Sequence, residues 1–207
     1  MADIDPDKPP PPEFMSALVT EHFVLQSTSS STISESGSRV SIYLSALSSG
    51  LVAIGFASGS PRALESLTFT VLPTVFMLGW FTIVRLTDTS VANAVAQRRM
   101  DRITAYYATL HPSAASYFET DDRRVRYGRW SFFFTMASMV IVVNSVVGGA
   151  TVTLVFALAI KAPAPVPVVL GIVAGLALLT AGLYYEHRRL TPVVLGGTTA
   201  SEPAPDK

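Results

Sequence analysis

The stretch VPVVLGIVAGLALLTAGLYY, residues 166–185, contains no charged residue and no histidine. An α-helix needs about 20 mostly apolar residues to cross the hydrocarbon core of a bilayer. That core holds no water to hydrogen-bond the backbone, so a spanning segment folds as a helix that satisfies its own backbone groups. Residues 166–185 therefore predict a membrane-spanning helix, and the rest of the chain can be searched for others.

Three further stretches of this kind precede it. The first is residues 40–58, VSIYLSALSSGLVAIGFAS, and the second is residues 67–84, LTFTVLPTVFMLGWFTIV. The third stays uncharged from Trp130 to Ile160, which is too long for one simple crossing and too short for two. It has to tilt, project beyond the bilayer or break near Gly148-Gly149, and we interpret it as one span with an extended outer end. The sequence thus predicts an all-α integral membrane protein with four transmembrane helices.

The composition agrees with this prediction and excludes several classes of site. Of the 207 residues, 49% are hydrophobic and 14% are charged, whereas about a quarter of a soluble domain is charged. The formal net charge is zero, so no nucleic-acid partner is expected. The chain has no cysteine, and its three histidines lie far apart. Disulfides and thiolate sites are therefore excluded, and no metal site is expected.

The basic residues give the spans an orientation. The segment of residues 87–129, between the second and third spans, is rich in arginine, whereas the loops after the first and third spans carry one basic residue each. Arginines also flank the first span at Arg39 and the fourth at Arg188 and Arg189. Because cytoplasmic loops carry an excess of Lys and Arg, both termini and the 87–129 segment are predicted to be cytoplasmic. Aromatic residues that favour headgroup depth fall near the same interface: Tyr43, Trp80, Tyr127, Trp130, Tyr184 and Tyr185.

The regions outside the spans complete the predicted organisation. Residues 1–12 are Pro-rich and expected to be disordered, residues 13–39 form a cytoplasmic helix leading into the first span, and residues 186–207 form a cytoplasmic tail. Residues 40–86 and 130–185 hold the two pairs of transmembrane helices. We expect residues 87–129 to form a basic cytoplasmic helical hairpin with arms at residues 88–110 and 113–118, because His111-Pro112 ends the first arm.

A row of serines runs from the first cytoplasmic helix into the first span: Ser27, Ser31, Ser34, Ser38, Ser41, Ser45 and Ser48. Their spacing alternates between 4 and 3 residues, which is that of a heptad seam on one helix face. We favour a helix-packing seam, within the chain or between chains, because small residues let helix backbones approach closely. The alternative is a hydrated lining of an oligomeric pore. Leu44 and Leu47 are expected on an exposed face.

Two features of the later spans also indicate helix packing. Gly171 and Gly175 form a GxxxG motif in the fourth span, which fits close packing against a neighbouring helix. Asn144 is the strongly polar side chain that we expect to be buried within the spans, and we interpret it as a hydrogen-bonding contact between helices.

The arginines of the 87–129 segment have two interpretations. Juxtamembrane arginines usually attract anionic lipid headgroups, and we favour this interpretation. The alternative is a phosphate-bearing ligand or partner, because the planar guanidinium fork matches phosphate. The residues concerned are Arg98, Arg99, Arg102, Arg123, Arg124 and Arg126.

The sequence contains no recognisable catalytic or ligand-binding motif. We find no phosphate-binding glycine loop, no metal-ligand pair at helical spacing and no nucleophile elbow. The four apolar stretches carry no Asp, Glu, Lys, Arg or His, which argues against a secondary transporter, because intramembrane charges mark ion pathways. We therefore predict that the chain is not an enzyme and needs no cofactor.

Several short patterns resemble a group of uncharacterised small four-span membrane proteins of actinobacteria. They are EHFVLQ at residues 21–26, TISES at 32–36, YL at 43–44, SSGLVA at 48–53, RITAYY at 102–107 and HP at 111–112. The resemblance implies a bacterial plasma membrane and carries no activity with it.

These observations favour a non-enzymatic multipass membrane protein that acts by association, as a homo-oligomer or as an accessory subunit of a membrane complex. Its expected partners are the lipid bilayer with its anionic headgroups and a second copy or another membrane protein. The alternative is a ligand-gated membrane effector or channel, with the serine row as pore lining and the arginines as sensor.

Overall fold

The computed structural model describes residues 11–110, 135–163 and 165–195, and these residues are helical apart from short connections. The elements are α1 (Pro12–Phe56), a 3-10 turn (Ala57–Gly59), α2 (Pro61–Leu110), α5 (Met136–Leu154), a π-helical turn (Val155–Ala159) and α6 (Val166–Leu195). Four helices are long and apolar enough to cross a membrane, as predicted. The all-helical architecture fits a multipass membrane protein.

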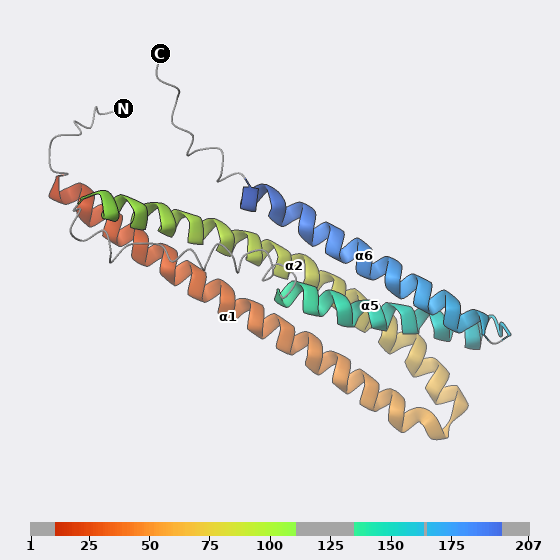
Figure 1. Ribbon diagram of the computed structural model, residues 1–207. Coiled ribbons are helices and arrows are strands. Elements are labelled where there is room, and N and C mark those ends of the chain that lie inside the picture. Colours follow the sequence, from red (N-terminus) through yellow and green to blue (C-terminus); the bar gives the residue numbers. More distant parts are fainter. Residues whose placement is uncertain (1–10, 111–134, 164, 196–207) are drawn as a thin grey trace, which may run out of the picture.

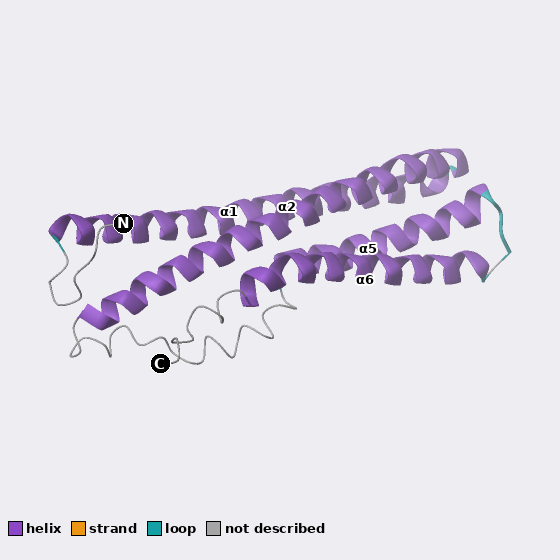
Figure 2. Cartoon of the chain, turned by 90° about the horizontal axis from the view of Figure 1, so that it is seen from above, coloured by secondary structure: helices purple, strands orange, loops and turns teal. Residues whose placement is uncertain are grey.

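The helices form two antiparallel hairpins of different length (Figures 1 and 2). The α1–α2 turn and the α5–α6 turn lie at the same end of the molecule, whereas the other end of α1–α2 reaches far beyond α5 (Figure 1). At 1.5 Å per residue, the 45 residues of α1 and the 50 of α2 correspond to about 67 and 75 Å. A hydrocarbon core is about 30 Å thick, so this hairpin is far longer than a crossing requires.

The long hairpin packs as an antiparallel coiled coil. The buried residues Ser29, Ser36, Tyr43 and Gly50 recur every seven positions on α1 and form what we call its inner row. This is the period of a helix that keeps one face on its partner. The pairs Ser29–Asn93 and Gly50–Val71 keep one register over this length. The short connection of residues 57–60 sets that register, and Pro61 favours the start of α2 there because proline suits the first position of a helix.

The short hairpin depends on glycines. A Cβ on Gly149 of α5 would lie 2.7 Å from the carbonyl oxygen of Gly171 and 3.3 Å from the Cα of Gly175 on α6. The two backbones are therefore in direct contact, and the apolar core continues from here to α1 and α2 through Ile141 and Val147.

A polar contact joins three helices inside this core. The hydroxyl of Tyr43 on α1 donates to Oδ1 of Asn144 on α5 at 3.2 Å, and both side chains are almost fully buried. A Cβ on Gly79 of α2 would collide with Asn144 and with the Tyr43 ring. Asn144 thus makes the interhelical contact that its place in the span suggested, and the Tyr43 side chain is buried among the helices.

The observed organisation differs from the predicted one in several details. The third apolar helix runs unbroken through Gly148-Gly149 and ends in the π-helical turn, because both glycines are needed for packing and neither ends the helix. Residues 88–110 are the straight continuation of α2, and in the described residues they pack against the N-terminal half of α1. The second predicted arm, residues 113–118, lies outside the described residues, as do Tyr127 and Trp130.

Candidate functional site

A belt of charged residues marks one end of the apolar part of the bundle. It consists of Glu35, Arg39, Arg85, Asp88, Glu186 and Arg189. Arg39 pairs with Glu35 at 2.7 Å, and Arg189 on α6 pairs with Asp88 on α2 at 3.2 Å. Between Glu65 and Arg85, α2 is free of charge for about 29 Å, which matches the thickness of a hydrocarbon core. The charged belt therefore lies where we expect the helices to leave the bilayer.

Beyond the charged belt, α1 and α2 continue together as a coiled-coil extension, which we define as residues 12–34 and 89–110. It is about 33 Å long at 1.5 Å per residue. Leu25, Ala96 and Ile103 form its buried core, and Phe14 meets Tyr106 edge to face with ring centroids 5.9 Å apart. The extension is therefore held by its own packing.

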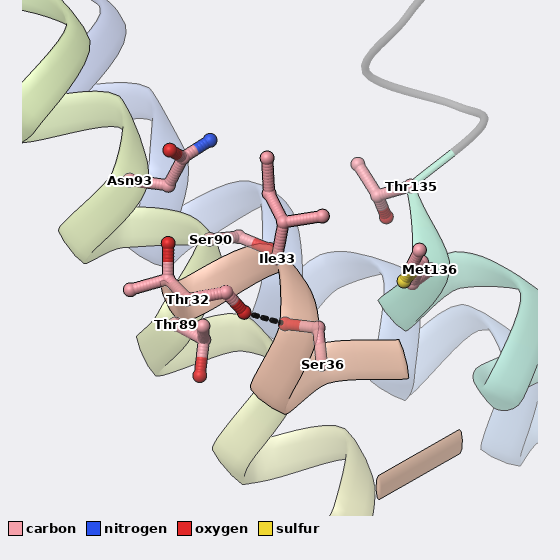
Figure 3. A pocket seen from close by; sticks show the side chains of 8 residues that line it. All are labelled: Thr32, Ile33, Ser36, Thr89, Ser90, Asn93, Thr135 and Met136. Atoms are coloured by element: carbon pink, nitrogen blue, oxygen red, sulfur yellow. Dashed lines mark hydrogen bonds between the residues drawn. The ribbon is translucent and has the colours of Figure 1, made fainter. Parts of the chain in front are cut away.

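A polar pocket of about 200 Å³ opens where the extension meets the N-terminus of α5 (Figure 3). Most of its lining is hydroxyl or amide side chains from three helices, with two apolar residues beside them: Thr32, Ile33, Ser36, Thr89, Ser90, Asn93, Thr135 and Met136. Ser29 donates to Oδ1 of Asn93 at 2.6 Å, and Gln97 donates to Ser29 at 3.1 Å. This chain of hydrogen bonds fixes the orientation of the Asn93 amide.

Glu186 is the one carboxylate of the charged belt that is buried, with 2% of its surface exposed. Its Oε1 accepts a hydrogen bond from the hydroxyl of Thr135, the N-cap residue of α5. Thr135 in turn accepts from the backbone N–H of Ser138 at 3.0 Å. A carboxylate at this position is stabilised by the partial positive charge of the helix N-terminus.

Sequence reasoning placed Glu186 in the tail and missed its burial. A signal was present in the spacing of α6, because Gly175 and Gly182 both pack on α5 and Glu186 comes one helical turn after Gly182. Glu186 therefore continues the face of α6 that is buried against α5.

The serine row predicted on α1 lies on an exposed face of the described chain. Ser27, Ser31, Ser34, Ser38, Ser41, Ser45 and Ser48 are all exposed, and we call them the outer serine row. Ser31, Ser38 and Ser45 each lie two positions after a buried residue of the inner row, and two positions turn a helix by about 200°. The outer serine row thus lies opposite α2. Leu44 and Leu47, which we expected to be exposed, are partly buried against the core.

The GxxxG motif of α6 packs against another helix of the same chain. A Cβ on Gly171 would lie 2.7 Å from the carbonyl oxygen of Gly149, and one on Gly175 would lie 3.2 Å from the carbonyl oxygen of Ser145. The neighbour that Gly171 and Gly175 pack against is therefore α5.

The arginines are only partly described. Arg98 is half-buried, Arg102 is exposed, and exposed Arg99 lies 4.0 Å from Glu21 of α1. Arg123, Arg124 and Arg126 lie outside the described residues. Arg98 comes about 20 Å after Arg85 along α2, whereas a headgroup layer is about 5–7 Å thick. A helix close to the bilayer normal would therefore hold these arginines beyond direct lipid contact.

Within the described residues, no group of three or more His, Cys, Asp or Glu side chains could hold a metal ion. Comparison with known proteins adds no relative: no protein family, curated protein or solved structure matches this chain.

Proposed function

We propose that this chain is a non-enzymatic multipass membrane protein that works by association through the outer serine row of α1. One observation carries the proposal. α1 has two heptad rows on opposite sides, and α2 covers the inner one, whereas the outer one is exposed along its whole length. A second row of small residues at this spacing is what close packing against another helix requires.

We favour a second copy of the chain as the partner that packs on the outer serine row. Copies in one membrane share the same orientation, so a two-fold axis along the bilayer normal brings two α1 helices together in parallel. The same face of each helix then meets itself, and a row of identical small residues is complementary to its own copy. An accessory role beside another membrane protein would use the same face.

The extent of the row favours packing over a pore. Ser27, Ser31 and Ser34 lie on the coiled-coil extension, beyond the charged belt, where a conducting pore needs no lining. In the apolar region, the Ser41 hydroxyl donates to the carbonyl of Gly37 at 3.0 Å, so it is satisfied without water. Conductance in liposomes that is lost on substituting Ser45 would favour the channel instead.

The proposed location is a bacterial plasma membrane with both termini in the cytoplasm. Enzyme reporters fused after Ala105 should be active in the cytoplasm, and reporters fused after Ser60 should not, because the charged belt and the extension carry the basic residues. An active reporter at Ser60 would reverse this orientation.

Cysteine cross-linking tests the association directly, because the chain has no native cysteine. Single variants Ser41→Cys, Ser45→Cys and Ser48→Cys should form disulfide-linked dimers in native membranes under mild oxidation, since a disulfide requires Cα atoms within about 7 Å. Leu176→Cys on α6 is a matched control, because Leu176 is 57% exposed but lies on a different helix from the row. Equal cross-linking at Leu176 and at the row would overturn the proposal. A heavier adduct with another protein would favour the accessory role.

A further inference from the structure

The polar pocket (Figure 3) presents hydrogen-bonding groups that the described residues leave unused. The Ser90 hydroxyl and the Asn93 amide nitrogen make no hydrogen bond to another described residue. In Figure 3 the Asn93 nitrogen points away from α2 toward the side where Thr135 lies. Across the pocket, the Ser36 hydroxyl donates to the Thr32 carbonyl at 2.9 Å, which leaves its oxygen able to accept. The pocket therefore offers both donors and acceptors.

The described lining of the pocket favours a neutral ligand over an ion. None of the described residues that line it is charged. The N-terminus of α5, which would otherwise attract an anion, is already compensated by the Glu186 carboxylate through Thr135. That carboxylate is not part of the described lining, whose oxygens available to a cation are all neutral. A neutral ligand with several hydroxyl groups matches such a surface, because hydroxyl groups both donate and accept.

The depth of the pocket indicates how such a ligand would reach it. Ser36 and Thr89 are each within one turn of a charged-belt residue, so the pocket lies at the expected level of the lipid headgroups. Ile33 and Met136, 54% and 48% exposed, stand at the pocket and can contact an acyl chain. A volume of about 200 Å³ is smaller than the roughly 300–1,000 Å³ of pockets for drug-sized ligands, which limits the ligand to a small group such as one sugar ring or a smaller polyol.

We propose that this pocket binds a neutral polyhydroxyl group, such as a sugar or polyol, presented by a lipid headgroup or free in solution. Binding would use Ser90 and Asn93 of α2 as donors and the hydroxyl oxygens of α1 and α5 as acceptors. This site is separate from the outer serine row and does not depend on the association proposed above.

Native mass spectrometry of the full chain in a polyoxyethylene detergent, which carries no sugar, tests this site. The probes are a monoglucosyl diacylglycerol, phosphatidylglycerol and phosphatidylethanolamine with the same acyl chains. We expect the glucosyl lipid to bind about tenfold more tightly than either phospholipid, a difference of about 1.4 kcal/mol. Equal retention of all three lipids, or a preference for phosphatidylglycerol, would overturn the proposal.

Two variants separate the site from unspecific lipid binding. Ser90→Leu fills the pocket and should abolish the preference, whereas Ser30→Leu, at an exposed α1 position outside the lining, should keep it. The melting temperature of each variant checks that it folds. If Ser90→Leu misfolds, Ser90→Ala, which adds no bulk, should still weaken the preference for the glucosyl lipid. An unchanged preference in Ser90→Ala and Ser90→Leu would refute the site. Competition by free glucose would identify a soluble ligand, and its failure to compete would identify the lipid.

Discussion

Replacing Gly149 by alanine should destabilise the bundle, although alanine is the better helix former. The new Cβ would lie 2.7 Å from the Gly171 carbonyl oxygen, whereas carbon–oxygen contacts of this kind normally measure about 3.3–3.6 Å. The neighbouring atoms belong to the backbone of α6, so no side chain can rotate away. One of the two helices has to move by about 0.6 Å or more over its length, and overpacking of this kind costs about 1–3 kcal/mol.

Gly37→Ala is the matched control for the helix preference of alanine. A Cβ at Gly37 meets nothing within 4 Å, so this variant should gain up to about 1 kcal/mol from propensity alone. The difference between the two variants in the free energy of unfolding, measured by SDS titration in mixed micelles, should therefore be about 1–3 kcal/mol. Equal stability of both variants would refute the close contact between α5 and α6.

Two further predictions concern single side chains. Asn144→Leu removes the partner of the buried Tyr43 hydroxyl and should lower the free energy of unfolding by about 1–3 kcal/mol, and the loss should shrink in a Tyr43→Phe background measured by the same titration. The triple variant Arg98→Lys, Arg99→Lys and Arg102→Lys should insert and melt as the wild type does. The exposed Arg99–Glu21 pair, 4.0 Å apart, contributes at most about 1 kcal/mol to stability. Loss of a cellular function with intact insertion would instead indicate a ligand that requires the guanidinium group.

The spans could be predicted from the sequence because a charge inside the hydrocarbon core is expensive. The charge-free length of the second span fits the bilayer thickness, and the four helices follow from such lengths. The mutual packing of the helices could not be predicted in the same way. Lipid tails are as apolar as leucine, so apolar side chains do not mark the buried face of a spanning helix. For this reason the sequence pattern predicts an exposed Leu44, although Leu44 packs on the core.

The two heptad rows of α1 illustrate the same limit. The outer serine row was visible because its residues are identical, whereas the inner row mixes Ser29, Ser36, Tyr43 and Gly50 and shares only the interval of seven. Sequence spacing alone does not decide which row meets α2. The polar pocket was equally hidden, because Thr32, Asn93 and Thr135 come together only through the register of three helices.

The stoichiometry of the chain in lipid nanodiscs, counted by native mass spectrometry, tests the central claim most directly. The wild type should hold two or more copies, and Ser41→Leu with Ser45→Leu should give single copies, because leucines keep the two α1 helices apart. Ala177→Leu with Ala181→Leu introduces two leucines at the same spacing at exposed positions of α6 and should leave the stoichiometry unchanged. A single copy of the wild type, or the same stoichiometry in both double variants, would contradict association through the outer serine row.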